Sequence, residues 1–251
     1  MHAATPNGTP QGGRAGAAAQ RSLSSAAARE PVFGIAPKQG PAMELKDRQL
    51  LQLFPTCLFV GKASDLSICD RLEAALRAMQ KAGEGSQDET FFMTRDDIHK
   101  RAEMKELCDL VLAESGKVFD FYRVKRQSHY ITDMWGNITN PNHRQAMHIH
   151  PNCLLSGIIY VTSPPDCGPT QFADPRPGAR MLEPSYSELT EFNSGQFMIA
   201  PEKGVMVMWP SFVPHAVERG RNRTHEDRII IAFNVMIRGA IDIPTAHLEL
   251  K

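Results

Sequence analysis

The sequence has no long apolar run, and none of its hydrophobic stretches approaches the roughly 18 residues that a membrane-spanning helix needs. It also has no excess of charge, because 28 Lys and Arg residues balance 28 Asp and Glu residues. A nucleic-acid-binding protein usually carries a basic excess, and a protein that binds membrane surfaces usually carries a charged block. Neither partner is therefore expected.

Cysteine is also scarce. The chain has five cysteines, an odd number, and they are widely scattered without a CxxC pair. This pattern excludes a zinc knuckle and a disulfide framework as the basis of the fold. Free cysteines are typical of a reducing compartment, so a cytoplasmic location is expected.

Large apolar residues are rare in residues 1–43, which are rich in Ala, Gly, Pro, Ser, Thr and Gln. Such a segment cannot bury enough surface to offset its ordering entropy, so we expect a disordered tail. It contains three arginines and Lys38 but only one acid, Glu30. An organellar transit peptide is therefore the alternative interpretation. Residues 44–251 are expected to form a single domain.

After the tail, the sequence predicts a strand and two helices first and a series of short strands afterwards. An opening strand within 50–60 is interrupted by Pro55, and a helix capped by Ser64 or Asp65 follows it. Residues 83–94 are polar and predict a loop, and a second helix is expected over 101–121, with a possible break at Gly116. Short strands are expected near 128–136, 145–150, 154–163, 169–173, 196–200, 205–209, 214–219 and 227–237. The fold class is therefore α+β, with a β-sandwich or barrel after two helices.

The first candidate metal-binding residues are His148 and His150, which lie just before an apolar strand. Residues i and i+2 of an extended strand point to the same face, so both imidazoles can reach one metal ion. A third histidine, His215, follows in a second apolar stretch, and Arg228 opens a further strand. A lone histidine in a strand is usually a hydrogen-bonded structural residue. A pair on one face needs partners for several ring nitrogens, and a shared Fe, Zn, Cu or Ni ion meets that need.

The order of these motifs resembles the iron(II)/2-oxoglutarate-dependent oxygenases, and most of all a bacterial and phage group of them. The resemblance covers about Leu50–Arg238 and is carried by the HxH pair, Gly157-Ile-Ile-Tyr-Val, Phe172-Ala-Asp-Pro-Arg, Trp209-Pro-Ser-Phe-Val-Pro-His and Arg228-Ile-Ile-Ile-Ala-Phe-Asn. It implies a double-stranded β-helix, or jelly-roll, with its core at about 128–238 and the helices packed outside. It also implies an oxidoreductase that uses Fe(II), 2-oxoglutarate and O₂, hydroxylates a substrate, and releases succinate and CO₂.

The resemblance assigns roles to particular residues. His148 matches the first metal ligand and His215 the distal one, whereas His150 stands where most members have a carboxylate. Either His150 binds the metal, which gives a three-histidine centre, or Asp174 supplies a carboxylate from another strand; we favour His150. Arg228 matches the residue that binds the distal carboxylate of 2-oxoglutarate, and Tyr160 occupies a place from which related oxygenases present a phenol to that carboxylate.

Two alternatives remain open from the sequence. A cupin-type metal protein, either a three-histidine dioxygenase or an isomerase, would share the HxH pair and the jelly-roll but would not need Arg228. A non-enzymatic β-sandwich binding module would explain the strands but not the order of three histidines and an arginine. The substrate, expected to be a small molecule or a peptide, is not identified by any motif.

Overall fold

The computed structural model describes residues 49–250 except 177, 179, 180, 182, 183, 222, 223 and 244. Contacts separate residues 1–50 from a unit of residues 51–251, and the fold is that of the second unit. The expected tail, residues 1–43, lies outside the described residues. Within the described part of the chain, no helix is long and apolar enough to cross a membrane.

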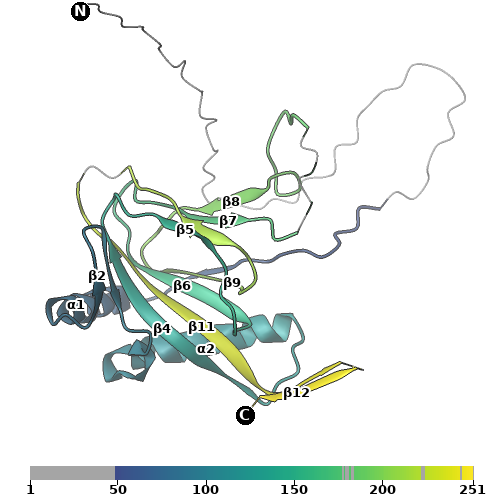
Figure 1. Cartoon of the computed structure of the whole chain (residues 1–251), viewed down its shortest axis with the longest axis horizontal. Coiled ribbons are helices and arrows are strands. Elements are labelled where there is room, and N and C mark those ends of the chain that lie inside the picture. The colour runs from purple at the N-terminus through teal and green to yellow at the C-terminus, as the bar shows by residue number, and fades with distance from the viewer. Residues whose placement is uncertain are drawn as a thin grey trace, which may run out of the picture. The chain divides into compact units, whose positions relative to one another are not determined.

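Two antiparallel sheets lie face to face (Figure 1). The larger sheet has the order β1 (Phe59–Lys62), β9 (Val205–Pro210), β6 (Leu155–Thr162), β11 (Arg228–Ile243), β4 (Ser128–Thr139), β3 (Phe91–Thr94) and β2 (Gly85–Gln87), and β12 (Ala246–Leu250) pairs with β11. The smaller sheet has the order β5 (Gln145–His148), β10 (His215–Val217), β7 (Thr170–Ala173) and β8 (Gln196–Ile199). This is the jelly-roll arrangement expected from the sequence.

The two long helices cover the outer face of the larger sheet. Helix α1 (Ser67–Lys81) has Leu66 at its N-cap in place of the expected Ser64 or Asp65, but the Asp65 carboxylate still accepts a hydrogen bond from the Ser67 backbone N–H at 2.9 Å. Two short 3₁₀ turns, Ile98–Lys100 and Ala102–Met104, lead into α2 (Lys105–Phe121). The buried faces of both helices join one hydrophobic cluster with Ile229, Ile231 and Phe233 of β11.

The alternate residues of β11 face the space between the sheets. Ile230 and Ala232 pack there in a second cluster that includes Tyr160 and Trp209. Strand β11 is therefore buried on both faces, which explains its nearly continuous apolar run. The inner face of β11 runs from Arg228 to Asn234. The candidate site lies in the interior that this face lines.

Residues 83–94 are not simply the loop that their polarity predicted. Two short strands, β2 and β3, form a hairpin there, and β3 pairs with β4. Phe92 is buried in the helix-side cluster, but Met93 and all of β2 are exposed. With so few buried positions, the hairpin has no apolar alternation for a sequence pattern to detect.

Helix α2 also differs from its prediction, because it runs through Gly116 without a break. A Cβ at position 116 would lie 3.3 Å from Cε1 of His129, so the glycine gives that ring room beside the helix. His129 Nε2 lies 2.8 Å from the Leu112 carbonyl oxygen. This histidine is thus a structural residue that joins β4 to α2.

Candidate metal centre

Three histidines from separate segments converge at one edge of the smaller sheet. His148 ends β5 and His215 begins β10, and the two residues are cross-strand partners. His150 lies just beyond the end of β5, where its backbone N–H donates to the Ser211 carbonyl at 3.1 Å. The expected strand over 145–150 therefore stops two residues early, and a backbone bond rather than strand alternation places His150.

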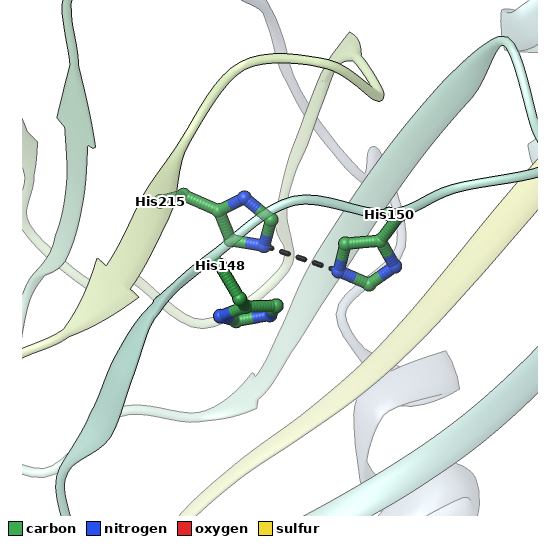
Figure 2. Close-up of side chains that lie close together, drawn as sticks. All are labelled: His148, His150 and His215. Atoms are coloured by element: carbon green, nitrogen blue, oxygen red, sulfur yellow. Dashed lines mark hydrogen bonds between the residues drawn. The ribbon is translucent and has the colours of Figure 1, made fainter.

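The three imidazole rings form a tight group (Figure 2). Ring centroids are 4.3 Å apart for His148 and His215, 5.0 Å for His150 and His215, and 5.2 Å for His148 and His150. One ligand nitrogen of each residue lies within 4.8 Å of those of the other two. The Nε2 atoms of His150 and His215 approach to 3.2 Å, so a single ion can be shared by nitrogens of this group.

Hydrogen bonds to the backbone orient two of the rings. His148 Nδ1 lies 2.8 Å from the Ala146 carbonyl oxygen, and His215 Nδ1 lies 3.1 Å from that of Val213. A carbonyl oxygen only accepts, so Nδ1 of each ring carries the proton. The Nε2 lone pairs of both neutral rings are then free for a metal, which is the arrangement that metal-binding histidines usually have.

Burial favours the neutral form of two of these rings, His150 and His215. Loss of solvent lowers the pKa of His215 to about 3, against the opposing effect of its bond to Val213, and the charges of His148 and His150 lower it further. Burial is also the main reason that the pKa of His150 is lowered. A metal binds the neutral imidazole, so His150 and His215 are ready to accept a cation at neutral pH without losing protons first.

Asp174, the alternative third ligand, has a different environment. Its carboxylate pairs with the guanidinium of Arg176 at 2.6 Å and also accepts the Arg176 backbone N–H at 3.0 Å. Among the residues that the structure describes, the group with metal-ligand spacing contains the three histidines and does not include Asp174.

Arg228 is the first residue of β11 and is only 4% exposed. One of its terminal nitrogens donates to the Thr170 hydroxyl at 3.2 Å, but its buried Nε has no hydrogen-bond partner. It makes no salt bridge with any other residue of the described chain. A buried guanidinium without a counter-charge is costly, so this site is suited to an anionic ligand.

Tyr160 completes this anion site. The Arg228 guanidinium carbon lies 5.2 Å from the centroid of the tyrosine ring, and the phenol oxygen is 2.7 Å from the Thr170 hydroxyl. Burial raises the pKa of Tyr160, although Arg228 opposes the shift, so the phenol keeps its proton and can donate it in a hydrogen bond. Thr170 was not singled out in the sequence, because a threonine in a strand gives no signal of its own.

Strand β7 connects the anion site to the histidines. Thr170 contacts Arg228, while Phe172, two residues further on the same face, is the cross-strand partner of His215. Two residues of a strand span roughly 7 Å. The anion site and the metal-ligand group therefore lie in the same interior, separated by about two residues of β7. A five-carbon dicarboxylate can bridge this separation.

A cavity of about 680 Å³ opens beside His150. The β2–β3 hairpin contributes Met93 and Ser86 to its lining, and β4 contributes Asp133 and Trp135. The Trp135 ring stacks on the His150 imidazole, with centroids 5.6 Å apart and ring planes inclined by 15°. The cavity gives a molecule of moderate size access to His150.

Comparison with known proteins supports an oxygenase. Residues 133–234 match the model of a family described as "Putative 2OG-Fe(II) oxygenase", and this segment contains all three histidines and Arg228. Comparison with curated proteins gives no match.

Solved structures show the same fold at low sequence identity. A Pseudomonas putida prolyl-4-hydroxylase has a TM-score of 0.53 and 14% identity, over 72% of this chain and 93% of its own. The epimerase SnoN, in complex with Fe³⁺, alpha ketoglutarate and nogalamycin RO, has a TM-score of 0.53 and 14% identity, over 77% and 88%. HygX from Streptomyces hygroscopicus, with nickel and 2-oxoglutarate bound, has a TM-score of 0.51 and 12% identity, over 78% and 93%.

The double-stranded β-helix and its histidine group first define the class of structure, which is a jelly-roll with a candidate metal site. The family match is more specific, since residues 133–234, the segment with the three histidines and Arg228, are similar to the 2-oxoglutarate–Fe(II) oxygenases. The matched family uses Fe(II), 2-oxoglutarate and O₂, and the SnoN and HygX structures contain a metal ion together with 2-oxoglutarate.

Proposed function

We propose that His148, His150 and His215 hold the iron of this oxygenase and that Arg228 and Tyr160 hold the distal carboxylate of 2-oxoglutarate. The observation that carries the proposal is the pairing of two sites in one interior. A group of three imidazoles converges at one point, and a buried arginine without a counter-charge lies in the same interior, about two residues of β7 away. Neither a purely structural histidine cluster nor a simple metal site would require both.

The metal site fits iron by its donor set. Imidazole nitrogen suits Fe(II), and three side-chain ligands leave coordination positions for a chelating co-substrate. Two of the ligands are fixed by backbone carbonyls, so little conformational entropy is lost when the ion binds. When bound, the iron supplies the oxidative decarboxylation of 2-oxoglutarate to succinate and CO₂ that is coupled to hydroxylation of the substrate.

The protein's own contribution is orientation and exclusion of water. Arg228 and the Tyr160 phenol offer the distal carboxylate a charge-assisted pair and a hydrogen bond, and this fixes the direction in which the keto acid enters. Ile230 and Trp209 line the interior and keep it apolar. The substrate, a small molecule or a peptide, enters through the cavity beside His150 and presents its C–H bond toward the histidines.

Iron content and succinate formation test the ligand assignment. His148→Ala and His215→Ala are expected to lose stoichiometric iron and succinate formation, because two remaining side-chain ligands rarely hold Fe(II) against water. His247→Ala is the matched control, since His247 is exposed on β12 and pairs with Asp242. Retention of full iron and turnover by either ligand variant would show that the assignment is wrong.

A further inference from the structure

The cavity beside His150 has a wall that neither the proposed metal site nor the proposed 2-oxoglutarate site uses. Its volume of about 680 Å³ lies within the range of small-molecule pockets, roughly 300–1,000 Å³. Apolar surface is supplied by Met93, Trp135, Ile149 and Pro151. In a pocket of this kind, a few polar groups fix the orientation of the bound molecule and set its chemical class.

The charged groups of this wall are mainly acidic. Two carboxylates, Asp96 and Asp133, line the cavity together with one guanidinium, that of Arg95. Arg95 Nε lies 3.8 Å from a carboxylate oxygen of Asp97, which is outside the lining, so part of the arginine charge is offset there. Within the described chain, neither Asp96 nor Asp133 forms a salt bridge. The wall therefore carries a net negative charge.

The carboxylate of Asp133 is held in a fixed orientation. One of its oxygens accepts a hydrogen bond from the Asn234 amide nitrogen, and the other accepts one from the Thr132 hydroxyl. Asn234 is itself only 5% exposed, so this contact is anchored in the sheet. Both donors are neutral, and each carboxylate oxygen can accept a further hydrogen bond. Asp133 is thus an oriented acceptor that has no counter-charge.

Trp135 connects this acceptor to the histidine group. It lies two residues after Asp133 on the same face of β4, a separation of roughly 7 Å along the strand. Its ring stacks on that of His150, with centroids 5.6 Å apart. A molecule whose positive group meets Asp133 can therefore lay its carbon skeleton along the indole and bring a C–H bond close to His150.

We propose that this cavity binds a small molecule with a protonated amine and an apolar body, and that Asp133 selects it by its charge. The inference rests on the proposed function and names the substrate class of that same site. It also gives the two organic reactants opposite electrostatic partners. Arg228 attracts the 2-oxoglutarate dianion, whereas the acidic wall repels an anion and raises the local concentration of a cation.

Tryptophan fluorescence can measure the charge of this cavity. The chain has two tryptophans, and Trp209 is only 1% exposed, whereas Trp135 is half-buried and lines the cavity. Quenching by small solutes therefore reports on Trp135. The quenchers are N-methylpyridinium, iodide and neutral acrylamide. The full chain is loaded with Zn(II), which has no redox chemistry, and with 2-oxoglutarate, whose two negative charges cancel those of the ion.

The expected quenching constant is larger for N-methylpyridinium than for iodide. Asp133→Asn should lower the first and raise the second, each about two- to three-fold at low ionic strength, because one charge is removed roughly 7 Å from the ring. Asp96→Asn should shift both constants in the same directions, and its exposed side chain makes no contact that the fold needs. An unchanged acrylamide constant in both variants would show that the cavity keeps its shape.

A carboxylate outside the cavity supplies the control. Asp109 is exposed on α2 and pairs with Lys105 at 2.6 Å, so Asp109→Asn should leave all three constants as in wild type. Quenching by iodide that equals or exceeds quenching by N-methylpyridinium in wild type would overturn the proposal. So would an unchanged N-methylpyridinium constant in both Asp133→Asn and Asp96→Asn.

A panel of primary amines, each paired with its N-acetyl derivative, tests the substrate class in turnover. Amines that raise succinate formation should lose this effect on acetylation, and their effect should fall in Asp133→Asn. Equal stimulation by the neutral derivatives would overturn the proposal.

Iron binding by His215→Ala separates this inference from the proposed function. If that variant loses iron while the quenchers show no preference for a cation, only the inference about the cavity is wrong. If it retains iron while the preference for a cation holds in the metal-free chain, the acidic cavity stands and the proposed iron site is wrong.

Discussion

The unpaired charge of Arg228 leads to the sharpest prediction about the co-substrate. Arg228→Met should strongly weaken 2-oxoglutarate binding while leaving the ligand-free fold at least as stable as wild type. In the absence of ligand the guanidinium is 4% exposed, and its Nε has no partner. Replacement of an uncompensated buried charge by an apolar side chain of similar length is often neutral or stabilising.

The expected loss of affinity follows from the geometry of the pair. Removal of one partner of a buried, hydrogen-bonded charge pair costs about 2–5 kcal/mol. With a factor of ten for each 1.4 kcal/mol, the dissociation constant of 2-oxoglutarate should rise about 30-fold or more. Arg228→Lys should fall between wild type and Arg228→Met, because it keeps the charge but loses the two-point contact.

Thermal unfolding under anaerobic conditions measures both effects. At a 2-oxoglutarate concentration 100 times its dissociation constant, the metal-loaded wild type should gain about 2.7 kcal/mol. For a domain of this size that gain raises Tm by roughly 5–11 °C. At the same concentration, a 30-fold weaker Arg228→Met should gain only about 0.9 kcal/mol, roughly a third of the wild-type rise, and a still weaker variant should gain less.

A matched arginine controls for the loss of charge. Arg238 lies on the same strand and stacks on Tyr130 at 4.4 Å, but it is exposed, so Arg238→Met should keep the ligand-induced rise. A wild-type rise in Arg228→Met, or a collapse of its ligand-free Tm, would refute the reasoning.

The remaining predictions concern the third ligand and the core. His150→Asp should keep iron but bind 2-oxoglutarate more weakly, because the centre loses one positive charge. His150→Ala should bind iron more weakly than both wild type and His150→Asp. Unchanged iron content in His150→Ala would contradict the three-histidine site. Asp174→Ala should retain iron, since its carboxylate pairs with Arg176, and loss of iron in that variant would favour Asp174 as the ligand. Gly157→Ala would place a Cβ 2.4 Å from Cζ of Phe233, so overpacking should cost about 1–3 kcal/mol and calorimetry should show a lower Tm; an unchanged Tm would mean that the core relaxes freely.

Much of the β-rich half could be predicted because its strands are long or strongly apolar. Strand β6 is buried along nearly its whole length, and the predicted span of 154–163 differs from Leu155–Thr162 by one residue at each end. The hairpin of β2 and β3 was missed because its residues have few buried positions. Strand β12 was missed for the same reason, since its residues are almost all exposed and pair only with β11.

The candidate site was found from the spacing of its histidines together with the family resemblance. The pairing of His148 with His215 depends on the register of two strands distant in sequence, and no local pattern specifies it. Thr170 could not be singled out, because its importance lies in its contacts with Arg228 and Tyr160 on two other strands. Such residues look like ordinary strand residues until the sheets are assembled.

The measurement that tests the central claim most directly is an anaerobic titration followed by visible absorption. Fe(II) is added first and 2-oxoglutarate second. The account predicts a charge-transfer band that appears only when both are present, and that is absent in His215→Ala and in Arg228→Met at the same concentrations. Iron binding without any spectral response to 2-oxoglutarate would contradict the account and favour a cupin-type metal protein. Failure to bind iron at all would favour a binding module.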